Sequence, residues 1–402
     1  MQFPKDFLNK KILIFGYGKT GKSAGKLLDK FKINYSIYDD NISKKKKLFD
    51  KEFYKNNYDF IILSPGINIY NHKKKIFFQK NKKKIITDLD IFFSFQKKYK
   101  YTIGITGTNG KSSFCNLLKD ILDRNNIKSK ILGNFGIPVL DKRISSDEIC
   151  IIELSSYQID YSKNLKLDKA CILNVSPDHL ERHRTISNYK KIKLKIFKFL
   201  KENGRGYYHQ KSFPKLKNIN KIKSFSNLNK IFLRNILGKN IKIHKNYHNQ
   251  IKNKLPHRVE FFYKKNNFKF INDSKSTNFD STRYAIKKYK NIILIMGGLL
   301  KKDDNYNLKD IYKNIEDIYL YGNNINQLKK NLKNQKIKYF LFDKLKNVLK
   351  DIYKNFYQKN KNNKKKFVVL LSPAAASFDQ FKNFEDRGNK FKKYIYELFK
   401  RS

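Results

Sequence analysis

The sequence predicts an α/β protein that folds as three domains. Short apolar runs rich in β-branched and aromatic residues alternate with lysine-rich segments that are compatible with helices, an order typical of βαβ units and parallel sheets. The runs form three series along 402 residues, and a chain of this length commonly divides into two or three domains. Its hydrophobic content of 40% is sufficient for packed cores. We therefore expect α/β domains over 1–97, 98–255 and 256–402.

The expected strands follow the three series in order. They are Ile12–Phe15, Tyr35–Tyr38 and Phe60–Leu63 in the first series, Tyr101–Thr106, Ile149–Leu154 and Ala170–Val175 in the second, and Ile292–Met296, Ile318–Tyr321 and Phe367–Leu371 in the third. Segment 201–255 is rich in Lys and Asn with weak periodicity, so its structure is the hardest to predict.

A glycine loop follows the first strand. It runs Gly16-Tyr17-Gly18-Lys19-Thr20-Gly21, and Asp39 ends the second strand. Glycines let a pyrophosphate approach a helix N-terminus, and the acid can accept hydrogen bonds from a ribose or a base. The pattern indicates a Rossmann-like domain, but it fits NAD, another nucleotide or a simple tight turn. The turn Ser64-Pro65-Gly66 ends the third strand at the same edge of the sheet.

A second loop follows strand Tyr101–Thr106 and has a sharper pattern. Gly107-Thr108-Asn109-Gly110-Lys111-Ser112-Ser113 precedes a helix-compatible segment. Backbone N–H groups of such a loop surround phosphates, its lysine reaches the β and γ oxygens, and Ser112 or Ser113 can approach Mg²⁺. Ile105 stands where the general phosphate-loop pattern has Gly, so this is a shorter variant in a phosphate-loop ATPase-like domain.

Polar residues at other strand ends are further candidates. Glu153 closes an apolar run, as an acid that meets a nucleotide-bound metal does, and Asp178-His179 follow the next run. His179 and His183 have the spacing of a transition-metal pair, but no further ligand is nearby, and we do not favour that site. Three loops of the last domain could equally bind an acidic substrate or form ordinary turns: Leu255–Arg258, Asn272–Asn278 and Ser372–Phe384.

The charge is extreme but scattered. With 89 Lys and Arg against 34 Asp and Glu, the formal net charge is +55. Lys, Asn, Ile, Phe and Tyr are enriched together, as an AT-rich genome produces, and the lysine runs lie on no single motif, so we expect a solvated surface and no specific nucleic-acid partner. The field can still attract anionic substrates. The three cysteines form no CxxC pair, and no segment resembles a leader or a membrane span, so we expect a cytoplasmic protein with reduced thiols.

Taken together, these clusters resemble the Mur ligase family, the ATP-dependent amino-acid ligases of cytoplasmic peptidoglycan synthesis. The resemblance rests on the phosphate loop, on Glu153–Gln158, on Asn174–His179 and on Asn272–Asn278. The run Ser377–Phe384 and the first glycine loop are similar to the branch of the family that adds D-glutamate. The resemblance implies an acyl-phosphate mechanism that ligates D-glutamate to UDP-N-acetylmuramoyl-L-alanine, with ATP and two Mg²⁺ ions, in a monomer without membrane insertion.

The resemblance also implies roles for individual residues. The UDP-substrate would contact Lys19, Thr20, Asp39, Gly66, Asn134 and His179. ATP would contact the loop residues Gly107, Thr108, Asn109, Gly110, Lys111, Ser112 and Ser113, and also Arg258 and Asp273. The metal ions would lie near Ser113, Glu153, His179 and Lys193, and D-glutamate near Thr277, Lys301, Ser377 and the backbone N–H of Phe384. The reacting groups would be handled by Lys111, His179, Lys193 and Arg258.

Two further points come from the resemblance, and alternatives for function stay open beside it. Lys193, selected by its spacing from Tyr189, would be carbamylated and so become an anionic metal ligand. The adenine contacts of the family have no clear counterpart in 229–255, where Asn235 and Asn240 are rival candidates. The alternatives for function are a Mur or folylpolyglutamate-type ligase for another amino acid and, from another class, a basic nucleic-acid-binding ATPase.

Overall fold

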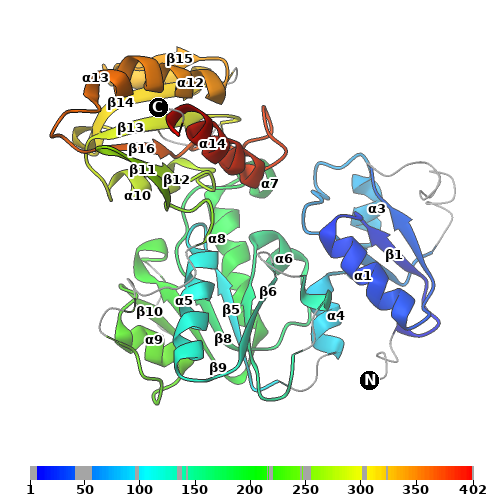
Figure 1. Ribbon diagram of the computed structural model, residues 1–402. Helices are drawn as coiled ribbons and strands as arrows, with labels where there is room; N and C mark the ends of the chain where they lie inside the picture. Colours follow the sequence, from blue (N-terminus) through cyan, green and yellow to red (C-terminus); the bar gives the residue numbers. More distant parts are fainter. Residues whose placement is uncertain are drawn as a thin grey trace. The chain divides into compact units, whose positions relative to one another are not determined.

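The structure is a computed structural model, and it describes residues 7–40, 57–95, 99–133, 138–141, 144–214, 216, 221–244, 247, 255–300, 306–322 and 325–400. The chain forms two compact units, residues 1–252 and 253–402. The described residues contain three sheets, two in the first unit and one in the second (Figure 1). The α/β fold class is therefore confirmed, whereas the boundaries between three domains stay a prediction.

The first sheet is small and parallel. Its strand order is β2-β1-β3-β4. The elements of this part are β1 (Ile12–Phe15), α1 (Lys19–Lys30), β2 (Tyr35–Tyr38), β3 (Phe60–Leu63), α3 (Lys75–Lys80), β4 (Ile85–Ile86) and α4 (Asp88–Phe95). Leu13 and Phe15 pack with α3 on one face, and Ile12 and Ile14 pack with α1 on the other. Because β1 lies inside the sheet, its residues are buried on both faces, which explains its uninterrupted apolar run.

The second sheet has six parallel strands in the order β10-β9-β8-β5-β7-β6. Its elements are β5 (Tyr101–Thr106), α5 (Lys111–Arg124), β6 (Ser129–Gly133), β7 (Ile149–Glu153), α6 (Ser156–Tyr161), β8 (Leu167–Ile172), α7 (Leu180–His183), α8 (Ile186–Leu194), β9 (Leu200–His209), β10 (Ile222–Phe225) and α9 (Lys230–Leu237). Ile151 packs with α5 and α9, and its neighbour Ile152 packs with α4 and α6. Helices thus cover both faces, and the loops that follow β5, β7 and β8 share one edge of the sheet.

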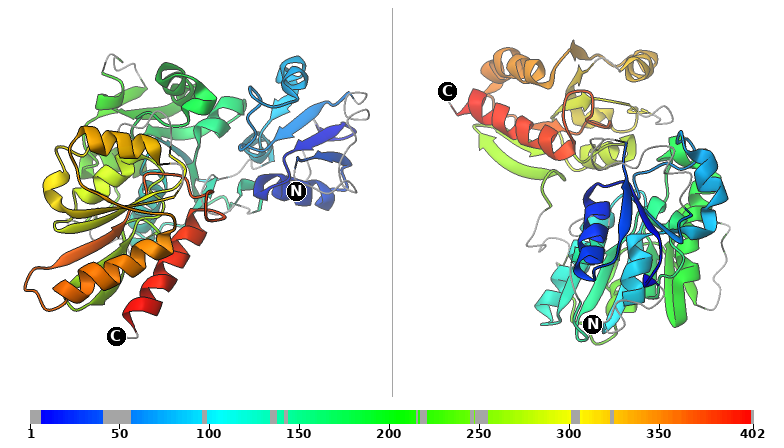
Figure 2. Two further views of the ribbon diagram at one scale, coloured as in Figure 1. Left: turned by 90° about the horizontal axis from the view of Figure 1, so that it is seen from above. Right: turned by 90° about the vertical axis from the view of Figure 1, so that its right-hand side faces the viewer.

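The sheet of the second unit has the order β11-β12-β16-β13-β14-β15, in which only the β11–β12 pair is antiparallel. Its elements are β11 (Glu260–Lys265), β12 (Phe268–Asn272), α10 (Phe279–Ile286), β13 (Ile292–Gly297), β14 (Ile315–Tyr321), α11 (Asn326–Asn334), β15 (Phe340–Phe342), α12 (Leu345–Asp351), α13 (Gln358–Asn360), β16 (Phe367–Leu371) and α14 (Phe384–Phe399). Leu294 packs with α10 and α11, and Ile295 packs with α12 and α14. Figure 2 shows α14 alongside this sheet in both views.

The expected strands are present, with one clear shift in position. The run expected at Ala170–Val175 forms β8 at Leu167–Ile172. The first residues of this strand include the charged Asp168. The strand tolerates this residue because its carboxylate accepts hydrogen bonds from the Thr102 N–H and hydroxyl (2.8 Å each) and from Lys201 Nζ. A search for apolar runs cannot detect such a start. It also missed the polar or short strands β4, β6, β9, β10, β11, β12 and β15.

No helix among the residues that the structure describes combines the length and apolarity that a bilayer span requires.

Candidate active site

The phosphate loop begins where β5 ends. Gly110 caps helix α5 with φ +81°, a conformation that glycine adopts without strain. The ammonium of Lys111 folds back over the loop and donates to the carbonyls of Gly107 (2.8 Å) and Thr108 (2.9 Å). The loop therefore places a cation beside the N-terminus of a 14-residue helix, which is the arrangement that binds phosphate.

Asn174 fixes the shape of this loop from the segment after β8. Its side chain accepts from the Asn109 N–H (2.9 Å) and donates to the Asn109 carbonyl (2.9 Å), and its own carbonyl accepts from the Thr108 N–H (3.0 Å). The Thr108 hydroxyl also bonds Ser176, donating to the Ser176 carbonyl (3.2 Å) and accepting from its N–H (3.1 Å). Two loops from different strands are thus locked together at the sheet edge.

The residues around this loop suit a magnesium ion that shares its ligands with a nucleotide. Glu153 ends β7, pairs in register with Ile105 at the end of β5 and is buried. Ser112 is buried, whereas Ser113 is exposed on the first turn of α5. Among the described residues no three His, Cys, Asp or Glu side chains are placed to hold a metal. Mg²⁺ commonly takes one or two carboxylates and completes its shell with phosphate oxygens and water, so the residues present fit it.

The two histidines of the Asp178–His183 segment have different partners. His179 precedes α7 with φ +56°, and its Nδ1 lies 2.8 Å from the Tyr157 hydroxyl. Its side chain is 38% exposed. His183 Nε2 bonds the Ser156 hydroxyl (2.9 Å), and burial, together with the charge of Arg182, lowers the pKa of His183 to about 4. The two rings therefore serve separate contacts.

Lys193 lies against the phosphate loop. Its side chain is 1% exposed, and its Nζ donates to the Gly107 carbonyl (3.0 Å) and the Thr106 hydroxyl (3.3 Å). Burial, and then the positive charge of Lys111, lower the pKa of the Lys193 amine well below its ordinary value. The structure thus places this lysine, which the sequence could not distinguish by composition from its neighbours, against the phosphate loop, and its role as a metal ligand stays a prediction.

The N-terminal glycine loop has a different construction. Asp39 accepts a hydrogen bond from the Tyr17 N–H (2.6 Å), so the acid expected to face a ligand also shapes the loop. A Cβ at Gly21 would lie 2.1 Å from the Gly16 carbonyl oxygen, so this glycine is needed for the close turn. Ser64 donates to the same carbonyl (2.6 Å) and ties the turn after β3 to the loop. Lys19 and Gly66 are exposed there, and Thr20 is half-buried.

The second unit gathers polar groups where β12 and β16 end. Asp273 is 4% exposed and accepts hydrogen bonds from Ser276 (2.5 Å), Ser372 (2.8 Å) and the Val259 N–H (3.0 Å). Burial raises the pKa of Asp273 to about 6, although these donors and Arg258 act in the opposite direction. Arg258 and Thr277 are half-buried, Ser377 is buried, and Phe384 is the first residue of α14. These residues all belong to the second unit.

Two buried arginines, Arg387 and Arg182, were missed from the sequence, because an isolated charged residue has no periodic or spacing signal, and His257 was included only as part of the candidate loop Leu255–Arg258. Arg387 donates to the Ser274 hydroxyl (2.9 Å) and carbonyl (2.7 Å). His257 Nδ1 lies 2.9 Å from Asn272 Nδ2. Arg182 is described below. Asn134 and Lys301, which were expected at the substrate sites, lie outside the described residues.

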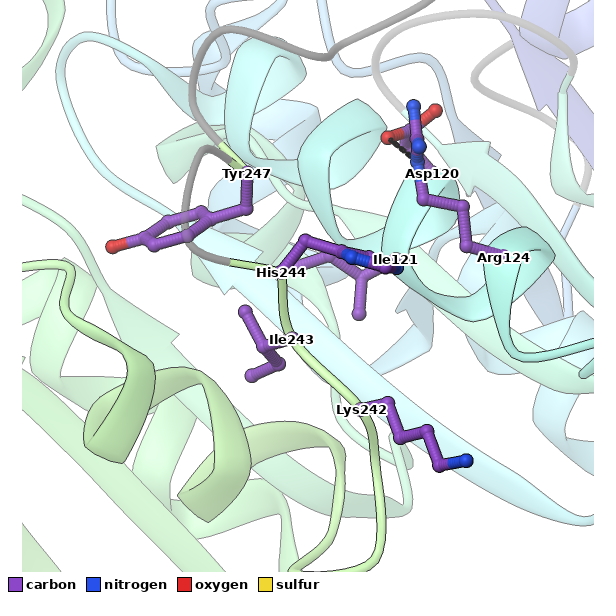
Figure 3. A pocket seen from close by; sticks show the side chains of 7 residues that line it. All are labelled: Asp120, Ile121, Arg124, Lys242, Ile243, His244 and Tyr247. Carbon is purple, nitrogen blue, oxygen red and sulfur yellow. Dashed lines mark hydrogen bonds and ion pairs between the residues drawn. The ribbon is translucent and has the colours of Figure 1, made fainter.

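The pocket in Figure 3 does not extend the candidate site. It lies between the C-terminal part of α5 and residues 242–244 and 247, and the Arg124 side chain pairs there with Asp120 (2.8 Å). Its volume of about 10 Å³ is close to that of one water molecule. Asn235 and Asn240, the rival candidates for adenine contacts, are exposed, and those contacts stay undecided.

Comparisons with known proteins agree with this geometry. A family model for the Mur ligase middle domain matches residues 105–230. UDP-N-acetylmuramoylalanine–D-glutamate ligases from Francisella tularensis subsp. mediasiatica (strain FSC147) and subsp. novicida (strain U112) are each 35% identical to the chain, with 98% of the chain and 97% of each relative covered.

Two solved structures share the fold at low identity. UDP-N-acetylmuramate–alanine ligase MurC from Thermotoga maritima superposes with a TM-score of 0.57 at 12% identity, covering 97% of this chain and 100% of that one. MurF ligase from the same organism, in complex with ADP, gives a TM-score of 0.56 at 14% identity, covering 99% and 98%.

Proposed function

Because the chain belongs to the Mur ligase family, we propose that it joins D-glutamate to the alanyl carboxylate of UDP-N-acetylmuramoyl-L-alanine with hydrolysis of ATP. The observation that carries this proposal is the phosphate loop with Lys111 folded over it and Lys193 buried against it. The name shared by the relatives supports the choice of D-glutamate. The product would be a precursor of peptidoglycan, made in the cytoplasm by a monomer.

The reaction would proceed in two steps. An oxygen of the alanyl carboxylate attacks the γ-phosphorus of ATP, the bond to the β,γ-bridging oxygen breaks, and ADP leaves. The amine of D-glutamate then attacks the acyl carbon and loses a proton, and inorganic phosphate departs. Lys111 and the N–H groups at the start of α5 are the groups of this chain that would hold the phosphates while charge moves between them.

Metal ions and the modified lysine complete this proposal. Glu153 and Ser113 would hold one Mg²⁺ and His179 and Lys193 a second, and the ions would neutralise charge on the transferred phosphoryl group. The Lys193 amine would attack CO₂, forming an N–C bond and releasing one proton, which gives an anionic carbamate. Only the neutral amine can react in this way, and the lowered pKa of Lys193 favours that form.

The substrate contacts are proposals of the same kind. Lys19, Thr20, Asp39, Gly66, Asn134 and His179 would bind the UDP-substrate, Arg258 and Asp273 would bind ATP, and Thr277, Lys301, Ser377 and Phe384 would bind D-glutamate. An ammonium, a hydroxyl and a backbone N–H can pair with the two carboxylates of D-glutamate. A substrate that lacks one carboxylate leaves donors unpaired, which costs about 1–3 kcal/mol or roughly 10- to 100-fold in rate.

The test is phosphate release from ATP with each combination of substrates. We expect release only with both the UDP-substrate and D-glutamate, and little release with lysine or diaminopimelate in its place. Faster release with either of these would move the protein to another branch of the family. ATP hydrolysis stimulated by DNA or RNA, with nucleic-acid binding that persists at physiological salt, would favour the basic ATPase instead, since unspecific phosphate contacts weaken steeply with salt.

A further inference from the structure

Arg182, on the short helix α7, is a buried cation. Its side chain is 5% exposed. The guanidinium carbon lies 3.8 Å from the centroid of the Tyr157 ring and 5.0 Å from that of Tyr161. Nη1 donates to the Pro65 carbonyl (2.9 Å), and within the described part of the chain Nε and Nη2 are buried without a hydrogen-bond partner. A buried, incompletely paired arginine is costly for folding, so a role in function deserves a test.

The contacts of Arg182 connect two parts of the first unit. Pro65 belongs to the turn after β3, in which Ser64 donates to the Gly16 carbonyl of the N-terminal glycine loop (2.6 Å). On its other side, Arg182 stacks on Tyr157, whose hydroxyl bonds His179 Nδ1 (2.8 Å). A continuous series of contacts therefore runs from the N-terminal glycine loop to His179.

This series reaches the His179 ring at Nδ1. The Tyr157 hydroxyl lies 2.8 Å from Nδ1, whereas the carboxylates of Glu181 (3.5 Å from Nδ1) and Asp178 (3.6 Å from Nε2) are more distant. The guanidinium carbon of Arg182 in turn lies 3.8 Å from the centroid of the Tyr157 ring, so that a movement of Arg182 changes the position of the Tyr157 hydroxyl. Since the ring of a histidine is oriented by the hydrogen bond that its other nitrogen makes, Tyr157 decides how His179 is presented.

We propose that Arg182 is a positioning residue. It holds Tyr157, and through Tyr157 the imidazole of His179, in a fixed position relative to the 64–66 turn of the UDP-substrate site. The effect on catalysis rests on the function proposed above, in which His179 lies near the reacting carboxylate. Binding of the UDP-substrate at the 64–66 turn then also stabilises the orientation of His179. Arg182 touches neither substrate in this proposal and acts only through Tyr157.

The first experiment needs no catalysis. In the free protein, the 15N and 1H resonances of the His179 ring are compared between the wild type, Arg182→Met and Tyr157→Phe. Both variants should move the His179 resonances. Arg184→Met is the matched control, because Arg184 is exposed two residues farther along and has no contact with Tyr157 among those described, and it should leave them in place. An unmoved His179 signal in a folded Arg182→Met protein overturns the proposal.

The second experiment measures kinetics and binding. Arg182→Met should lower kcat roughly 10- to 100-fold, since small misplacement of a reacting group has this effect. Its calorimetric Kd for a non-hydrolysable ATP analogue should stay within about twofold of the wild type. Arg182→Lys, which keeps the charge but not the planar guanidinium, should recover little of the lost kcat. A purely structural role predicts instead a lower melting temperature with unchanged kcat in the folded fraction.

The double variant decides whether the two residues act in series. If Arg182 works through Tyr157, Arg182→Met combined with Tyr157→Phe should be no slower than the slower single variant. Multiplied losses would mean independent roles and would overturn the proposal. The two hypotheses can fail separately. If the wild-type protein does not ligate D-glutamate, the proposed function is wrong. The His179 resonances need no catalysis, so they still test whether Arg182 positions His179.

Discussion

Lys193 in the first unit and Asp273 in the second are both buried ionisable residues at the carboxyl ends of parallel strands. Lys193 bonds the last residues of β5 and the phosphate loop, and Asp273 follows β12 directly. Burial favours the neutral form of each, because it lowers the pKa of Lys193 and raises the pKa of Asp273. The partners differ, however, because Lys193 faces two neutral oxygens and the cation Lys111, whereas Asp273 receives three hydrogen-bond donors.

This difference decides whether charge persists at neutral pH. The donors around Asp273 favour the carboxylate and keep its pKa at about 6, so that it is mostly ionised at pH 7. For Lys193, burial and the positive charge of Lys111 both lower the pKa of the amine, and the opposing charge of Asp178 does not outweigh them. Burial can thus prepare a reactive neutral amine in one place and a fixed anionic acceptor in another, depending on the neighbouring donors and charges.

The largest expected effect concerns Lys193. Lys193→Ala should lower the ligation rate by about 10³-fold, the size expected when a preorganised electrostatic group is lost. Lys191→Ala, on the exposed side of the same helix, is the matched control and should have little effect. A short carboxylic acid in the buffer should partly restore Lys193→Ala by replacing the carbamate oxygens. Full activity of Lys193→Ala in the phosphate-release assay would contradict the claim that the buried Lys193 amine is prepared for a role in the reaction.

Asp273 should make stability depend on pH. Its pKa of about 6 lies above the ordinary 3.8, so the folded state holds the proton more tightly than the unfolded state. The resulting stabilisation is complete below pH 3.8 and is lost as pH rises through 6. Relative to the wild type, Asp273→Asn should therefore gain about 2 kcal/mol in free energy of unfolding between pH 4 and pH 7. Urea unfolding of both proteins at the two pH values measures this gain. If the free energy of unfolding differs between variant and wild type by the same amount at both pH values, the pKa of Asp273 is not raised.

A smaller effect should follow from removing one donor of Asp273. Ser372 donates to Asp273 Oδ2. Ser372→Ala should therefore raise the pKa of Asp273 further and lower the free energy of unfolding at pH 7 by about 1–2 kcal/mol. The same variant at pH 4 is the control, because the protonated acid needs the donor less and the loss should shrink. A loss that is larger at pH 4 would mean that Ser372 serves packing and not the anion.

The sequence predicted functional roles for both Lys193 and Asp273, but it did not predict the surroundings of their side chains. Gly107–Ser113 could be assigned because a strand, a glycine loop and a lysine have fixed spacing. Lys193 was selected among neighbouring lysines by resemblance alone, and its burial depends on β5 and the phosphate loop, which are far away in the sequence. The charge state of Asp273 likewise depends on Val259 and Ser372, which the chain brings together only on folding.

Strands that are wholly buried and uniformly apolar were the easiest to predict, whereas strands that contain charged residues were missed or misplaced, even inside a sheet, as with β12. Inner strands such as Ile12–Phe15 and Phe367–Leu371 are wholly buried and form plain apolar runs. The exposed β15, Phe340–Phe342, and the charged start of β8 have no such run. Arg182 was missed for a related reason: one arginine in a lysine-rich chain looks like surface, and only its contacts with Tyr157 and Pro65 identify it as buried.

The smallest expected effect tests whether burial outweighs a nearby cation. Cys115 lies in the first turns of α5, where the charge of Lys111 lowers the pKa of its thiol, but burial raises that pKa more strongly. Cys150 and Cys171 are also buried free thiols with raised pKa values. Since the thiolate is the reactive form, iodoacetamide at pH 8 should modify none of the three in the native protein, whereas all three should react in urea. Mass spectrometry of the native protein gives the answer, and early modification of Cys115 alone would show that the cation of the phosphate loop, and not burial, controls ionisation at this edge of the sheet.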